Sequence, residues 1–226
     1  MSEKKQKELF EEASSYQFAT EQILLGPWTS YSILTDPKHL GFVLSRYKFA
    51  SKMIREGGTT LEVGCGDGIG APVLGAASSS YLGIDVDDRL ISDNTERLAR
   101  IHNLKFSKVD VTTLDTSTKY DNVVHIDVLE HLDAELEKAF VEKSVDALKQ
   151  DGVYICGSPS KYSEAYASPQ SALQHINLKT APAMKALFEP YFNYVWIFSM
   201  NDEMVHTGYH PMAHYLFAVC AGKRIQ

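Results

Sequence analysis

The stretch Thr59-Thr60-Leu61-Glu62-Val63-Gly64-Cys65-Gly66-Asp67-Gly68-Ile69-Gly70 decides the fold of this chain. Its first five residues predict a short buried strand, and the alternating glycines that follow predict a sharp turn out of that strand. Glycine has no Cβ atom, so the backbone of such a turn can approach a ligand closely. A carboxylate at the end of a buried strand is costly unless it meets a polar ligand or a donor. The stretch therefore predicts a cofactor site at Glu62 and the glycine turn.

Strands and helices alternate along most of the chain. The predicted helices cover residues 2–20, 37–56, 69–77, 88–102, 133–149 and 179–189, and an aromatic loop is expected at 25–31. The predicted strands cover residues 60–64, 81–86, 106–111, 122–126, 153–157, 194–198 and 214–219. This order predicts an α/β, Rossmann-like, mostly parallel sheet with helices on both faces. The last two strands have no helix between them, so we expect them to pair antiparallel at one end of the sheet.

Length and composition favour one domain, residues 1–226, in which residues 1–56 form an N-terminal helical cap. The hydrophobic content of 44% and the charged content of 23% are typical of a soluble globular protein. A net charge of −7 argues against a nucleic-acid partner. The polar N-terminus and the lack of a long apolar run predict neither a secretion signal nor membrane contact. Three widely spaced cysteines predict no disulfide framework, and we expect a cytoplasmic protein whose oligomeric state stays open.

The glycine turn has to be assigned to one class of nucleotide ligand. A loop that cradles the phosphates of ATP or GTP ends in Gly-Lys-Ser or Gly-Lys-Thr, but here Ala71 follows Gly70. Asp85 follows Gly66 by 19 residues, where any adenosine ligand needs a carboxylate for its ribose hydroxyls. Glu62 favours a ligand with an amino group, because a carboxylate there would repel a pyrophosphate. An oxidoreductase that binds NAD remains the alternative outside the class chosen below.

The order of motifs is Glu62-x-Gly64-x-Gly66-x-Gly68, then Gly83-Ile84-Asp85, Asp110, and Asp127-Val128-Leu129-Glu130-His131-Leu132. Over roughly residues 40–220 this order resembles the class I S-adenosylmethionine-dependent methyltransferases. The resemblance implies a seven-stranded sheet whose last strand is inserted antiparallel, with S-adenosylmethionine as the cofactor. It also implies the cofactor contacts: Gly64 and Gly66 at the methionine part, Asp85 at the ribose, Val86 and Asp110 at the adenine, Arg46 at the carboxylate, and Cys65, Val111 and Ile126 beside them.

Asp127, Glu130 and His131 stand at positions i, i+3 and i+4, which share one face if the segment is helical. Two carboxylates and an imidazole suit a divalent ion such as Mg, Mn or Fe, and His175 offers a further ligand. The element resembles that of metal-dependent O-methyltransferases, including the small-RNA 3′-terminal and ubiquinone-pathway enzymes, which carry a glutamate where this chain has Asp127. The same Val-Leu-Glu-His-Leu stretch also occurs in class I enzymes without a metal, so both interpretations stay open.

Residues 201–215 form a loop rich in histidine that is expected to overhang the substrate pocket. His206 and His210, together with His175, are the candidate catalytic residues, because an imidazole can act as a general base near neutral pH. With the aromatic segment 25–31, this loop resembles methyltransferases of bacterial surface-polysaccharide pathways. That resemblance implies O-methylation of a small polar acceptor such as a sugar, a nucleotide sugar or a phosphorylated glycan precursor. N-methylation and O-methylation of a quinone-like phenol remain alternatives.

Overall fold

The computed structural model describes residues 2–14 and 22–225, and its core is one eight-stranded sheet. The sheet has the strand order β3-β2-β1-β4-β5-β8-β6-β7. The strands are β1 Gly58–Val63, β2 Ser78–Asp85, β3 Leu104–Lys108, β4 Tyr120–Ile126, β5 Leu148–Pro159, β6 Phe192–Asn201, β7 Met204–His206 and β8 Tyr215–Lys223. The helices are α1 Glu3–Ser14, α2 Pro27–Thr35, α3 Pro37–Met53, α4 Ala71–Ala76, α5 Asp88–Arg97, α6 Ala134–Asp146, α7 Pro169–Gln174 and α8 Ala181–Phe188.

The predicted α/β sheet is confirmed, with one strand more than the seven expected. Strands β1 to β5 pair in parallel, and β8 lies antiparallel between β5 and β6. The additional strand is β7, which pairs with the end of β6 through the two-residue turn Asp202–Glu203. Asp202 has a positive φ of 49°, as tight hairpin turns require. The loop between the last two predicted strands therefore begins as a β-hairpin.

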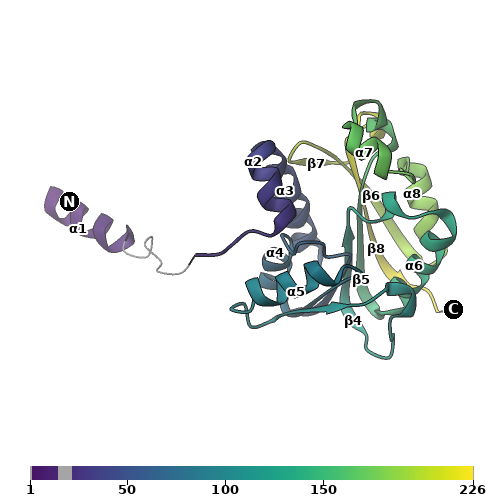
Figure 1. Cartoon of the computed structure of the whole chain (residues 1–226), viewed down its shortest axis with the longest axis horizontal. Coiled ribbons are helices and arrows are strands. Elements are labelled where there is room, and N and C mark those ends of the chain that lie inside the picture. The colour runs from purple at the N-terminus through teal and green to yellow at the C-terminus, as the bar shows by residue number, and fades with distance from the viewer. Residues whose placement is uncertain (1, 15–21, 226) are drawn as a thin grey trace.

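Helices cover both faces of the sheet (Figure 1). One apolar cluster joins the sheet to α6 and α8 through residues such as Phe140, Met184 and Phe188. The other joins the opposite face to α3 and α4 through Tyr47, Ala50 and Leu74, among others. Because both faces are covered, a ligand reaches the sheet only at its ends, which is where open α/β folds bind their ligands.

The aromatic loop predicted at 25–31 is wrong, because most of this segment belongs to helix α2. Pro27 occupies the first turn after Gly26, an arrangement that favours the start of a helix. Thr29 is the buried residue of α2, and its backbone N–H donates to Oδ2 of Asp67 over 2.7 Å. The helix is thereby attached to the glycine turn, while its apolar side chains Trp28, Tyr31 and Leu34 stay exposed.

Helix α1 stands apart from the rest of the molecule (Figure 1). It covers residues 3–14 of the helix predicted over 2–20, and residues 15–20 lie outside the described residues. Among residues 2–14 and 22–225, no helix is long and apolar enough to cross a membrane. Of the N-terminal helices, α2 and α3 reach the glycine turn: Thr29 of α2 bonds to Asp67, and Tyr47 of α3 lies against Gly70.

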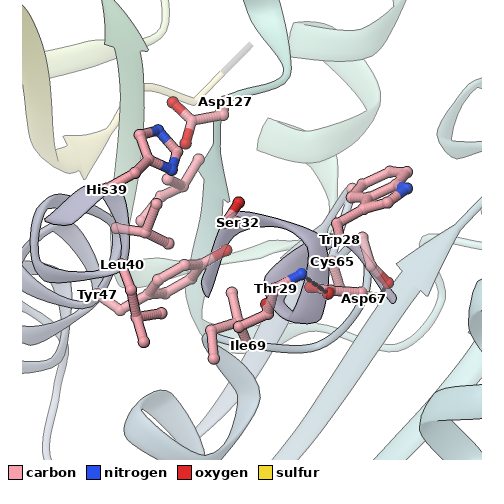
Figure 2. A pocket seen from close by; sticks show the side chains of 14 residues that line it. Trp28, Thr29, Ser32, His39, Leu40, Tyr47, Cys65, Asp67, Ile69 and Asp127 are labelled. Carbon is pink, nitrogen blue, oxygen red and sulfur yellow. Dashed lines mark hydrogen bonds between the residues drawn. The ribbon is translucent and has the colours of Figure 1, made fainter. Parts of the chain in front are cut away.

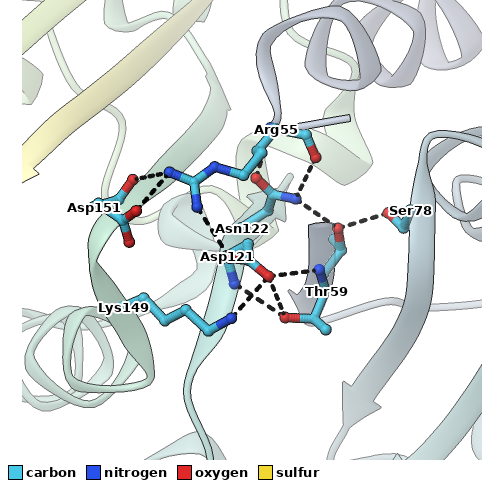
Figure 3. A network of polar contacts seen from close by, with 8 residues as sticks. Arg55, Thr59, Ser78, Asp121, Asn122, Lys149 and Asp151 are labelled. Carbon is cyan, nitrogen blue, oxygen red and sulfur yellow. Dashed lines mark hydrogen bonds and ion pairs between the residues drawn. The ribbon is translucent and has the colours of Figure 1, made fainter. Parts of the chain in front are cut away.

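A polar network fastens the end of α3 to the start of the central strands β1, β4 and β5, at the end of the sheet opposite the glycine turn (Figure 3). Arg55 follows α3 and forms ion pairs with Asp121 at 3.2 Å and with Asp151 at 2.9 Å. The Asp121 carboxylate also accepts the backbone N–H of Thr59 and pairs with Lys149. Burial alone would raise the pKa of Asp121, but the bonds from Thr59 and Lys149 outweigh it and lower the pKa to about 2. The network fixes the position of α3 and of the residues that α3 brings to the site.

Candidate functional site

Two adjoining cavities open at the carboxyl ends of the parallel strands. The larger, of about 330 Å³, lies against the ends of β2 and β4 and the segment after β3. The smaller, of about 190 Å³, lies beneath α2 and α3 (Figure 2). Both cavities are lined by Trp28, Gly64, Gly66 and Asp127. The glycine turn and the end of β4 therefore form the boundary between two spaces for ligands.

The glycine turn needs its glycines for steric reasons. Gly64 has a φ of +76°, and a Cβ atom there would lie 2.5 Å from Cγ2 of Val128. Gly66 has a φ of +53°, and its Cβ would lie 3.0 Å from the ring of Trp28. Side chains at these two positions would strain the backbone and crowd the residues that line the cavities. The turn thus keeps its backbone free of side chains where both cavities meet it.

The larger cavity has two carboxylates among apolar walls. Asp85, at the end of β2, accepts the N–H of Gly66 through Oδ2 and the N–H of Asp87 through Oδ1, both at 3.0 Å. Asp110 accepts the N–H and the hydroxyl of Thr112 through Oδ1. A carboxylate has about four acceptor positions, so both groups keep capacity for a ligand. Ile84, Val86, Val109 and Val111 line the same cavity, which suits a flat ring between apolar side chains.

The predicted cofactor residues divide into two groups in the structure. Eight of them line one or both cavities: Gly64, Cys65, Gly66, Asp85, Val86, Asp110, Val111 and Ile126. Glu62 and Arg46 line neither cavity. Each of these two side chains interacts with other residues of the protein: Glu62 with two tyrosine hydroxyls, and Arg46 with the carboxylate of Asp127.

Glu62 is fully buried below the glycine turn. One carboxylate oxygen accepts the hydroxyl of Tyr47 at 2.8 Å, and the other accepts the hydroxyl of Tyr81. Burial raises the pKa of Glu62 to about 7, although both tyrosine hydrogen bonds oppose the shift. We predicted that Glu62 accepts a hydrogen bond from an amino group of the ligand. In the structure its hydrogen-bond donors are Tyr47 of α3 and Tyr81 of β2.

Arg46 lies under the boundary of the two cavities. Its guanidinium is 2.7 Å from Oδ2 of Asp127 and 4.2 Å from the centre of the Tyr215 ring. Asp127 has a φ of +59°, an uncommon conformation for a residue other than glycine. Such strain persists where the surroundings hold the residue in place, and it is concentrated at functional sites. Here the ion pair between Arg46 and Asp127, together with the contact of Arg46 with the Tyr215 ring, keeps Asp127 in this conformation at the end of β4.

Three of the four predicted metal ligands come together. Glu130, His131 and His175 each offer a ligand atom, and these atoms lie within 4.8 Å of one another. Oε2 of Glu130 accepts the hydroxyl of Ser158 at 3.1 Å, whereas the buried Oε1 has no hydrogen-bond partner among residues 2–14 and 22–225. Nδ1 of His131 lies 3.2 Å from the carbonyl oxygen of Gln174, which leaves Nε2 available. The group has the donors of a divalent-ion site.

Asp127 is not part of this group, which corrects the expected helical spacing. The helix after β4 is a short 3-10 turn, Leu129–His131, and it begins only after Asp127. Because Asp127 has a positive φ, its side chain does not share a helical face with Glu130 and His131. It pairs with Arg46 instead.

A family model described as a methyltransferase domain matches residues 61–154, which run from the second half of β1 into β5 and include most of the cavity residues. Less than half of the chain is thus similar to a methyltransferase domain. A probable S-adenosylmethionine-dependent methyltransferase of Mycolicibacterium smegmatis is 28% identical over 105 residues, which are 46% of this chain and 39% of that protein. The chain thus spans less than half the length of the curated relatives it matches.

Solved structures with the same fold include methyltransferases bound to a cofactor product. The N-methyltransferase NodS of Bradyrhizobium japonicum, in complex with S-adenosyl-L-homocysteine, matches with a TM-score of 0.61 and 17% identity over 85% of this chain and 91% of that one. The DhpI–SAH complex matches with a TM-score of 0.65 and 13% identity over 86% and 90% of the two chains. These structures show the fold of this chain, which is the Rossmann-like α/β fold that the motif order implied.

The histidines of the loop 201–215 do not line either of the two cavities. Nε2 of His206 lies 2.9 Å from Oδ1 of Asn201, and its Nδ1 accepts the N–H of Gly208 at 3.1 Å. Nδ1 of His210 lies 2.8 Å from the hydroxyl of Ser199. These contacts hold the β6–β8 connection in shape, and a catalytic role of His206 and His210 stays a prediction.

Sequence reasoning missed one histidine of the smaller cavity. His39, on α3, lies next to Asp127 on the cavity wall (Figure 2). Burial and the nearby Arg46 lower the pKa of His39, against the opposing effect of Asp127 and Asp36. Its position seven residues before Arg46 gives it the same helical face, a signal that the sequence contained.

Proposed function

We propose that this chain transfers a methyl group from S-adenosylmethionine to a hydroxyl oxygen of a small acceptor, assisted by a divalent metal. The observation that carries the proposal is the group Glu130, His131 and His175, of which His131 also lines the larger cavity. A metal held there would stand beside the space proposed for the methyl donor. The coarser part of the proposal, the donor, is supported by the family and its relatives.

The residues of the larger cavity fit the donor. Gly64 and Gly66 keep the backbone clear of side chains where the methionine part would pass. Asp85 would accept the ribose hydroxyls, and Asp110 would accept the adenine amino group between the apolar walls. The donor is a sulfonium that activates its own leaving group, so the protein has mainly to align donor and acceptor and exclude water.

The three-residue group fits a metal for a reason independent of its resemblance to known enzymes. Burial, followed by the charge of Asp127, raises the pKa of Glu130. A buried carboxyl whose Oε1 has no partner is costly, and a bound cation would remove that cost. The chemistry that a metal would supply is to lower the pKa of an acceptor hydroxyl.

The acceptor that we propose is a sugar, a nucleotide sugar or a phosphorylated glycan precursor, entering by the smaller cavity. Ser32, His39 and Asp67 supply polar groups on that wall. A second candidate is a phenol, because Trp28, Leu40, Val43 and Ile69 make much of the same wall apolar. N-methylation is the third, and it is the activity that the name of the NodS neighbour states for that protein.

The test combines cofactor binding, metal content and product mass. Purified protein should bind S-adenosylhomocysteine in calorimetry and should not bind NADH. With S-adenosylmethionine and a panel of sugar nucleotides, sugar phosphates, catechols and amino sugars, mass spectrometry should find a product 14 Da heavier (one CH2). Chelation should abolish turnover and Mn²⁺ should restore it. Full turnover of metal-free protein would overturn the metal part, and binding of NADH alone would overturn the whole proposal.

A further inference from the structure

The two edges of the sheet differ in how they are protected. Edge strands expose unpaired backbone groups, and soluble proteins protect them with lysines, prolines, bulges or short length. At one edge, β3 has five residues, of which Lys105 and Lys108 are exposed lysines. At the other edge, β6 has ten residues with the sequence Phe-Asn-Tyr-Val-Trp-Ile-Phe-Ser-Met-Asn. This strand contains no charged residue and no proline.

Strand β7 covers only part of the β6 edge. It pairs with Ser199, Met200 and Asn201, so residues 192–198 have a strand partner on one side alone, which is β8. Among residues 2–14 and 22–225, no other backbone group hydrogen bonds to the backbone of residues 193–198. A stretch of seven uncharged residues therefore presents an open strand edge.

The register tells which residues direct their backbone outward. Asn201 and Met204 flank a two-residue turn and so form a hydrogen-bonded pair, as do Ser199 and His206. The β6–β8 register is unbroken from Phe192 to Met200. Hydrogen-bonded positions alternate along an antiparallel strand, so the outward N–H and C=O groups beyond β7 belong to residues 193, 195 and 197.

Two exposed aromatic side chains stand beside this open edge. Tyr194 is 59% exposed and Trp196 is 48% exposed. Their rings are stacked, with centroids 5.6 Å apart and an angle of 5° between the ring planes. The side chains of Val195 and Ile197, by contrast, pack on the apolar cluster of the opposite face of the sheet. The edge thus combines free backbone groups with a flat apolar surface on one face.

We propose that the β6 edge is the interface with a second copy of this chain, joined by antiparallel β6–β6 pairing about a twofold axis at Val195. In this register Val195 pairs with itself and Asn193 pairs with residue 197 of the other copy. Tyr194 of each copy then lies opposite Trp196 of the other, which forms a cluster of four aromatic rings. Pairing of this kind between aromatic side chains stabilises adjacent strands.

A second copy fits this edge for two reasons. Because β6 has no charge, pairing with itself brings no like charges together. Pairing of β6 with β3 of another copy would instead build an open-ended assembly, and the lysines at positions 105 and 108 of β3 oppose it. The twofold arrangement pairs the open β6 edge of each copy with that of the other and so closes the assembly at two chains.

The experiment uses the full-length chain in light scattering coupled to size exclusion, from micromolar to hundreds of micromolar. The wild type should have twice the chain mass of 25.2 kDa. Val195→Pro removes the backbone N–H of residue 195, which points away from β8 and would donate to the second copy. Trp196→Lys places a charge in the aromatic cluster. Each should raise the dissociation constant at least tenfold. Tyr31→Ala, at an exposed aromatic of α2, is the matched control and should leave it unchanged.

Cross-linking tests the register. Val195→Cys should form a disulfide between two copies under mild oxidation, because opposite residues of a hydrogen-bonded pair have Cα atoms about 5.5 Å apart. The three native cysteines are buried and should give no such product. Tyr31→Cys should stay monomeric on a non-reducing gel. A wild type that is monomeric over the whole range, or a dimer that both edge variants leave intact, would overturn the proposal. Binding of S-adenosylhomocysteine reports separately whether each variant is folded.

Discussion

The guanidinium of Arg46 lies 2.7 Å from the carboxylate of Asp127, which ties helix α3 to the end of β4 directly beneath the two cavities. Arg46 has 15% of its side chain exposed and Asp127 has 32%. The pair is therefore largely desolvated, and the loss of one partner leaves the other charge without compensation.

Arg46→Ala is expected to lower the free energy of unfolding by about 2 kcal/mol, below the range for fully buried pairs because Asp127 is a third exposed. Urea unfolding of the wild type, Arg46→Ala, Asp127→Asn and the double variant would measure the coupling between the two residues. We expect the double variant to be clearly more stable than the sum of the single effects implies. Additive effects would contradict the importance of the ion pair.

Gly64→Ala is expected to weaken the binding of S-adenosylhomocysteine at least tenfold. A methyl group there strains a φ of +76° and meets Val128 at 2.5 Å. The matched control is Gly57→Ala, which has a similar φ of +69° but no atom within 4 Å of its Cβ. Both variants should lose about 1 kcal/mol of stability from backbone strain. Only Gly64→Ala should lose affinity in calorimetry, and equal affinity of the two would argue against the glycine turn as the cofactor site.

Glu62 should make the stability depend on pH between about 4.5 and 7. Its pKa is raised in the folded state to about 7, so the folded protein binds the proton more tightly than the unfolded chain does. The stabilisation is complete below the unfolded pKa and is lost as the pH rises through 7, by an amount on the order of 3 kcal/mol.

Chemical unfolding at pH 5 and at pH 8 would check this prediction. The Glu62→Gln variant, which cannot ionise, should lose less stability between the two values than the wild type does. Glu130 also has a raised pKa and contributes in the same direction, so the difference between the two proteins is the informative quantity. Identical pH dependence would contradict the raised pKa of Glu62.

Asp121 should act in the opposite direction at acid pH. Its pKa is lowered to about 2, so its contribution is present above the unfolded value of 3.8 and disappears as the pH falls towards 2. At pH 7, Asp121→Asn should cost on the order of 2 kcal/mol of stability. Asp151→Asn is the control, because it contacts the same Arg55 but its side chain is 72% exposed. Its effect on stability should be much smaller, because solvent screens an exposed ion pair.

The sequence predicted the strands and the residues at their carboxyl ends, because both can be recognised from short stretches of sequence. Apolar runs marked the strands β1, β2, β4, β5, β6 and β8, and the central ones among them are apolar because helices cover both faces of the sheet. The glycine turn, Asp85 and Asp110 could be recognised because strand ends of a parallel sheet meet at one edge. The same logic placed His131 beside the larger cavity and His175 near it.

What could not be predicted depends on contacts between distant residues. Glu62 is satisfied by Tyr47 and Tyr81, whose hydroxyls reach it only in the folded chain. Asp127 does not join the other predicted metal ligands, because its positive φ and its ion pair with Arg46 direct its side chain elsewhere. Neither feature can be recognised from the neighbouring sequence. Helix α2 buries only Thr29, so its sequence lacks the apolar periodicity by which helices are recognised.

Trp28 belongs to the wall of both cavities, and its ring lies against Gly66. Two molecules bound in the two cavities at the same time would both contact the indole ring of Trp28. Thermodynamic linkage then requires reciprocity: whatever factor the first occupant imposes on the affinity of the second, the second imposes on the first.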